Sequence, residues 1–152
     1  MILIAHRGNI DGRSESHENE PSYIDLALSK GYDVEIDVWY IDKQLYLGHD
    51  KAQYGVDFRW FRDRITKLWI HCKNIESVIY FSECGYDFNY FWHENDTITL
   101  TSTNKIWAFP GKQPIKNSIA VMPEIYNDEI YECSGICSDF VKNYKMNQID
   151  ES

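Results

Sequence analysis

Short runs of apolar residues recur along the chain, and each run ends in polar residues. Eight runs have the length of a β-strand, and several are nearly continuous, which is typical of strands covered on both faces. The runs are residues 2–5, 34–38, 68–72, 88–92, 98–100, 106–109, 119–122 and 136–137. Because amphipathic stretches separate the early runs, the pattern favours a parallel α/β fold.

Helices are predicted at residues 22–31, 57–64 and 75–84. The first has Pro21 before it and Gly31 at its end, which are natural start and stop signals. After about residue 95 the gaps between apolar runs become too short for three-turn helices, so the second half is predicted to be strands and loops.

Eight strands suggest a closed barrel. A chain of 152 residues provides 19 residues for each of eight units, against about 31 in ordinary barrels of this type. We therefore expect a compact (β/α)8 TIM-type barrel with reduced or missing helices in the second half. Such a barrel needs its bare strands covered, so we also expect a homodimer.

Composition and charge narrow the functional classes. The chain has 15 Lys and Arg against 24 Asp and Glu, a net charge of −9, which excludes a nucleic-acid partner bound through bulk positive charge. Only four apolar residues separate Met1 from His6, and no later run approaches ~18 residues, so we expect no signal peptide, no membrane span and a cytoplasmic location. No linker divides the chain, which predicts one domain over residues 1–147 and a frayed acidic tail at 148–152. The four cysteines lack Cys-x-x-Cys spacing and are interpreted as buried thiols.

Candidate chemistry is concentrated in four segments of the first fifty residues: 6–8, 18–21, 35–37 and 49–50. Each lies where a predicted strand ends or a loop begins, which is where a parallel barrel builds its active site. Glu35 and Asp37 are two apart on one strand, so both carboxylates face the same side and can bind one divalent cation. The alternative is a solvated pair on an edge strand.

Two histidines and an arginine add to this acidic pair. His6 and His49 titrate near neutrality, so one can take a proton from a nucleophile while the other donates a proton to a leaving group. Arg7 offers a planar fork suited to phosphate oxygens. Each residue alone is more often structural, as a satisfied histidine or a salt-bridged arginine.

Together the segments His6-Arg7-Gly8, Glu18-Asn19, Glu35-Ile36-Asp37-Val38 and Leu47-Gly48-His49-Asp50 resemble the ordered signature of the glycerophosphodiester phosphodiesterase family. The resemblance implies a (β/α)8 barrel that hydrolyses small phosphodiesters with a divalent metal. It implies acid/base roles for His6 and His49, phosphate contacts for Arg7 and Lys73, and metal ligation by Glu35 and Asp37. Glu18 would match the acidic residue of the family's Glu-Asn-Thr segment, a further candidate ligand. Residues 135–141 resemble the family's last strand, which often closes with Thr-Asp.

The chain departs from this family at two places. His71 stands where the family usually has another metal-binding glutamate, and is itself a candidate ligand. Mg²⁺ or Ca²⁺ remain the leading metals, but imidazole makes Mn²⁺ or Zn²⁺ tolerated as well. Glu94 or Glu124 could compensate as ligands, and His17 and His93 are weaker candidates that are more often loop residues. The stretch from His49 to His71 is too short for the family's usual insertion, so glycerol specificity is unsupported.

The leading hypothesis is metal-dependent hydrolysis of a small phosphodiester by the two histidines. Two alternatives stay open: a non-hydrolytic barrel that binds a phosphorylated ligand or partner protein, and a lyase-like enzyme that forms a cyclic phosphate.

Overall fold

The structure, a computed structural model, describes residues 1–145. The predicted acidic tail therefore lies outside the described residues. Ten strands form one sheet: β1 (Ile2–His6), β2 (Asp33–Ile41), β3 (Gln44–Leu47), β4 (Tyr54–Val56), β5 (Leu68–Cys72), β6 (Tyr90–Trp92), β7 (Ile98–Leu100), β8 (Ile106–Ala108), β9 (Ser118–Val121) and β10 (Gly135–Ser138). The helical segments are α1 (Pro21–Ser29), α2 (Phe58–Asp63), α3 (Ile75–Glu83), the 3-10 turn η1 (Pro123–Ile125) and residues 141–145. All eight predicted strands and all three predicted helices are confirmed.

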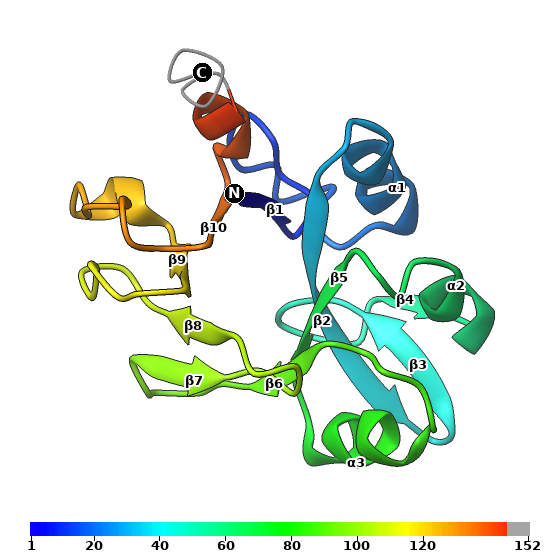
Figure 1. The fold of residues 1–152 in the computed structure, drawn as a ribbon. Helices are drawn as coiled ribbons and strands as arrows, with labels where there is room; N and C mark the ends of the chain where they lie inside the picture. Colours follow the sequence, from blue (N-terminus) through cyan, green and yellow to red (C-terminus); the bar gives the residue numbers. More distant parts are fainter. Residues whose placement is uncertain (146–152) are drawn as a thin grey trace.

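The sheet is mixed and strongly curled, and it forms a half-barrel (Figure 1). Seven strands run parallel in the order β6-β5-β2-β1-β10-β9-β8. β7 pairs antiparallel with β8, and the hairpin β3–β4 pairs antiparallel with the second half of β2.

The predicted (β/α)8 TIM-type barrel is therefore wrong. A parallel connection needs about a dozen residues, usually with a helix, whereas only residues 101–105 join β7 to β8, so the chain turns back as a hairpin. In the described chain α1, α2 and α3 all lie before residue 84, and the strands after β6 have no α-helix between them.

Apolar residues occupy both faces of the curled sheet. On the outer side, Ile24 and Ala27 of α1 pack in one cluster with Phe61 of α2 and Phe81 of α3. The inner cluster draws on six strands and comprises Ile4, Trp69, Phe91, Trp107, Ile119, Val121 and Cys137. The rings of Phe91 and Trp107 lie 4.7 Å apart, so aromatic side chains join β6 to β8 across the concave side. Trp69 and Trp107 are therefore core residues on the concave side of the sheet.

Over residues 1–145, no helix has both the length and the apolar character needed to cross a membrane. The homodimer stays a prediction. Ile98 and Leu100 of β7 are 47% and 59% exposed, which is the kind of bare strand that motivated it.

Candidate active site

Glu35 and Asp37 lie at the centre of the sheet, on β2 between β1 and β5. Their alternation with Val34, Ile36 and Val38 divides the strand into two faces, because side chains two apart point the same way. The three apolar residues enter the outer core, and the two carboxylates point to the concave side. Glu35 is 2% exposed and Asp37 is fully buried. Two buried carboxylates side by side are costly unless a cation or hydrogen bonds compensate them.

His71 faces this acidic pair from the neighbouring strand, β5, where it is in register with Asp37. Its Nε2 lies 3.1 Å from the carbonyl oxygen of His93. Because a carbonyl can only accept, Nε2 carries the hydrogen, and in the neutral ring Nδ1 then presents a lone pair. Nδ1 lies 3.2 Å from Asp37 Oδ1 and 3.8 Å from Glu35 Oε2. The backbone bond thus aims an imidazole lone pair at two carboxylates.

The donor atoms of this trio fit a divalent cation. One ligand atom each from Glu35, Asp37 and His71 lies within 4.8 Å of the others. Glu35 Oε1 and Asp37 Oδ1 are buried and have no hydrogen-bond partner. Buried oxygens without a donor normally have a reason, such as an ion at the site. Two carboxylates and one imidazole suit Mn²⁺ or Zn²⁺ as well as the harder Mg²⁺.

The electrostatics of the acidic pair are asymmetric. Burial, and then the neighbouring charge of Asp37, raise the pKa of Glu35 well above its ordinary value of 4.5. Burial would also raise the pKa of Asp37, but hydrogen bonds from His49 and His71, which these rings give when the facing nitrogen carries a hydrogen, and the charges of protonated His71 and of Arg7 outweigh burial and hold that pKa well below 3.8. Asp37 is therefore the permanently ionised member, whereas Glu35 ionises fully only when positive charge is near.

His6 ends β1 and stands beside Glu35, with which its backbone is in register. Its Nδ1 lies 2.8 Å from Asp139 Oδ1, and its Nε2 lies 3.8 Å from Glu35 Oε1. Burial alone would raise the pKa of Asp139, but the hydrogen bond and charge of His6 lower it. An ionised Asp139 therefore fixes the hydrogen of His6 on Nδ1 and leaves Nε2, on the side of the metal-ligand candidates, free to accept a proton.

Arg7 links the acidic pair to His49. Its Nε lies 3.3 Å from Asp37 Oδ2, its Nη1 lies 3.2 Å from Glu18 Oε1, and its Nη2 lies 2.7 Å from His49 Nδ1. His49 Nδ1 lies 3.4 Å from the same Asp37 oxygen. Arg7 has φ of 56°, a left-handed conformation that L residues adopt only when the surroundings impose it. The guanidinium is thus held at the mouth of the site.

Glu18 binds Arg7 at the mouth of the site and does not belong to the group of ligand candidates Glu35, Asp37 and His71. Its oxygens accept hydrogen bonds from Arg7, from Asn9 at 2.9 Å and from Arg13 at 3.4 Å. Burial would raise the pKa of Glu18, but these donors lower it. The predicted role of Glu18 as a metal ligand has no support from its contacts, although the residue lies in the same network.

The remaining candidates lie at different distances from the centre. Lys73 follows β5 and is near enough for its charge to lower the pKa of Glu35. His93 is buried, with Nδ1 2.8 Å from Asp96 Oδ2. Glu94 is exposed nearby. Glu124 accepts hydrogen bonds from Ser138 and Tyr144, both at 2.7 Å, so its carboxylate is committed elsewhere. His17 is exposed and contacts the hydroxyls of Ser14 and Ser16.

Sequence reasoning missed three residues that hold this arrangement. Asn19 donates to Asp37 Oδ2 at 2.9 Å and accepts from the Asp37 backbone N–H at 3.0 Å. Asn9 donates to Glu18 and to Asp139, both at 2.9 Å. Asn19 and Asp139 stood inside the motifs that carry the family resemblance, which was the available signal. Asn9 had none.

Two hollows flank His49. One, of about 310 Å³, is lined by Arg7, Glu18 and Lys51 among others. The other, of about 490 Å³, is bordered by His71, Lys73 and the aromatic rings of Trp39, Trp92 and Phe109. A ligand with an anionic centre at His49 therefore has room on both sides.

Comparisons with protein families, with curated proteins and with solved structures found no match to this chain.

Proposed function

We propose that this chain is a metal-dependent hydrolase that cleaves a small phosphodiester. The observation that carries the proposal is the orientation of His71. Its Nδ1 is aimed by a backbone hydrogen bond at two buried carboxylates, each of which has an oxygen without a partner. These ligand atoms favour the binding of a divalent cation at the carboxyl ends of parallel strands, where α/β enzymes have their active sites.

A divalent cation bound there would stabilise the negative charge that develops on the phosphoryl oxygens. Arg7 and Lys73 stand on either side of the acidic pair and would hold the phosphate by charge-assisted hydrogen bonds. Arg7 already contacts His49, so an anion bound by Arg7 would also lie beside that imidazole.

The two histidines supply the proton transfers. His6 is oriented by Asp139, and His49 has a side chain that is 38% exposed and can exchange protons with water. One accepts the proton of the attacking hydroxyl, and the other protonates the leaving oxygen. Because one histidine must be neutral while the other is protonated, the rate should have a bell-shaped pH profile. The family resemblance assigns the same pair.

The test is hydrolysis of bis(p-nitrophenyl) phosphate with Mg²⁺, Ca²⁺, Mn²⁺ or Zn²⁺, with and without a chelator. We expect metal-dependent turnover that falls about 10²- to 10⁴-fold in His6→Ala and in His49→Ala. His17→Ala is the matched control, because His17 is an exposed histidine outside the network, and should retain turnover. Near-normal rates in both active-site variants would refute the assignment. Metal binding without turnover under every metal would instead favour the non-hydrolytic alternative, and a cyclic product seen by phosphorus NMR would favour the lyase.

A further inference from the structure

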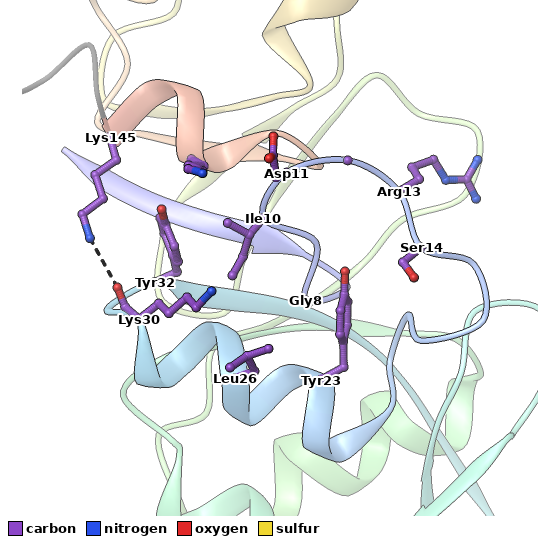
Figure 2. A pocket seen from close by; sticks show the side chains of 12 residues that line it. Gly8, Ile10, Asp11, Arg13, Ser14, Tyr23, Leu26, Lys30, Tyr32 and Lys145 are labelled. Carbon is purple, nitrogen blue, oxygen red and sulfur yellow. Dashed lines mark hydrogen bonds between the residues drawn. The ribbon is translucent and has the colours of Figure 1, made fainter.

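A third cavity, of about 780 Å³, is lined by the loop that follows β1 and by α1, and His49 is not among its lining residues (Figure 2). Its walls are α1, the loop of residues 8–14, Tyr32 before β2 and the helical residues 141–145. None of the metal-ligand or acid/base candidates lines it. Concave sites for small molecules typically have volumes of about 300–1,000 Å³.

The cavity is basic in an acidic protein. Four of its 12 lining residues are Lys or Arg and one is acidic, although acids outnumber bases across the whole chain. Arg13 is paired with Glu15 and Glu18. Lys30, Lys142 and Lys145 take part in no ion pair within the described residues. In Figure 2 the acid, Asp11, lies apart from Lys30 and Lys145. Three lysines that line one cavity and have no ion-pair partner in residues 1–145 favour an anion over a cation there.

Flat aromatic rings and apolar side chains line the interior of the cavity. Figure 2 shows the rings of Tyr23 and Tyr32 along its sides, with Ile10 and Leu26 between them. Lys145 Nζ lies 5.2 Å from the centre of the Tyr32 ring and 3.4 Å from the carbonyl oxygen of Lys30, so the lysine head is held at the aromatic wall. Aromatic faces next to cations suit a ligand that has both a ring and a negative charge.

Backbone hydrogen bonds hold the walls of the cavity in place without a ligand. Gly12 N–H donates to the Asp139 carbonyl at 2.8 Å, and Lys142 N–H donates to the Ile10 carbonyl at 3.1 Å. Gly8 has φ of 91°, and a side chain there would come within 2.7 Å of the Tyr23 ring. The absence of a side chain at Gly8 therefore lets Tyr23 close one side. A pre-formed cavity loses little entropy on binding.

We propose that this cavity binds a small organic anion composed of a flat ring and a phosphate or similar anionic group. The ring lies between Tyr23 and Tyr32, over Ile10 and Leu26, and the anion is held by Lys30, Lys142 and Lys145. The inference does not depend on the proposed hydrolase activity, because it uses none of the same side chains.

The test is a ¹H–¹⁵N NMR titration of the full chain in the presence of a chelator, with three probes: phenyl phosphate, phenol and inorganic phosphate. We expect saturable shifts of the Ile10, Gly12, Lys30 and Lys142 amides with phenyl phosphate, and at least about tenfold weaker binding, or 1.4 kcal/mol, for either part alone. The paired substitution Lys30→Glu with Lys142→Glu should weaken phenyl phosphate by at least about tenfold.

A matched control carries the same charge change at Lys112→Glu with Lys116→Glu, two exposed lysines outside the cavity, and should keep the wild-type affinity. The milder pair Lys30→Gln with Lys142→Gln should weaken binding in the same direction and guards against misfolding of the first variant. Equal loss in the control pair, inorganic phosphate binding as well as phenyl phosphate, or shifts confined to amides around His49 would each overturn the proposal.

Discussion

Replacing Glu35 by Gln is expected to make the metal-free protein more stable while it removes metal binding. Glu35 is 2% exposed, its Oε1 has no hydrogen-bond partner, and it stands beside ionised Asp37. Glutamine has the shape of the protonated carboxyl group but no charge, so the variant avoids the cost of ionising a buried acid beside another carboxylate. We therefore expect Glu35→Gln to raise the free energy of unfolding in chelator at pH 7 by about 1–3 kcal/mol.

The direction in which the free energy of unfolding changes with pH follows from the pKa shifts of Glu35 and Asp37. Burial, followed by the charge of Asp37, raises the pKa of Glu35 above 4.5, so folded Glu35 keeps its proton at a pH where the unfolded chain has lost it. The stabilising contribution of Glu35 is therefore complete below about pH 4.5 and is lost as the pH rises through the folded pKa. Asp37 has a lowered pKa and acts in the opposite sense, contributing above 3.8 and losing its contribution as the pH falls. Because glutamine does not titrate, Glu35→Gln should abolish the loss of stability that accompanies a rise in pH through the folded pKa of Glu35.

The assay is urea denaturation followed by circular dichroism, between pH 4.5 and 8, with chelator and with divalent cation. A cation at a hundred times its dissociation constant should stabilise the wild type by about 2.7 kcal/mol, and should have little effect on Glu35→Gln. Glu132→Gln, the same chemical change at an exposed position, is the control and should leave both quantities unchanged. A less stable Glu35→Gln in chelator, combined with no stabilisation of the wild type by any cation, would refute the reasoning.

Three further perturbations have defined outcomes. Asp139→Asn should lower the turnover number for bis(p-nitrophenyl) phosphate about 10- to 100-fold without changing the fold, because His6 loses its ionised partner at 2.8 Å; an unchanged rate contradicts this role. Gly48→Ala should lower the free energy of unfolding by about 3 kcal/mol or more in a urea melt, because its Cβ would clash with the Lys51 carbonyl oxygen at φ of 152°; wild-type stability would show that the turn can rearrange. Cys84, the one half-buried cysteine, should react first with a thiol reagent in a colorimetric time course, whereas burial raises the pKa of the other three thiols; simultaneous reaction of all four contradicts the packing.

Strands such as β9 and β10 were predictable because their apolar runs are buried as a unit, whereas β7 was predictable from its apolar residues although two of its three side chains are exposed. The hairpin β3–β4 was missed although Leu45 and Leu47 alternate with Tyr46 in the half-buried pattern of a strand. Its turn hides the signal, because Asp42 and Lys43 both have positive φ, a conformation that sequences usually mark with Asn-Gly. The barrel expectation failed for a different reason. Counting strands does not reveal their direction, and a short loop reversed β8 relative to β7.

The convergence of His6, Glu35 and Asp37 followed from one rule, that the carboxyl ends of parallel strands share one edge of a sheet. His49 reaches the same place for another reason, because the antiparallel strand β3 returns along β2 to the level of Val38. Their partners did not follow from that rule. Asp139 reaches His6 across 133 residues of sequence, and no local pattern encodes such a contact. The opposite pKa shifts of Glu35 and Asp37 could not be predicted either, because they depend on which donors surround each carboxylate in three dimensions.

The most direct test of the central claim is a crystal structure of the chain soaked in Mn²⁺, with anomalous difference density measured for the metal. We expect one strong peak bonded to Glu35, Asp37 and Nδ1 of His71, on the side of the sheet that His6 and His49 face. A well-ordered site without a peak at saturating Mn²⁺, or a peak held by other residues, would contradict the account.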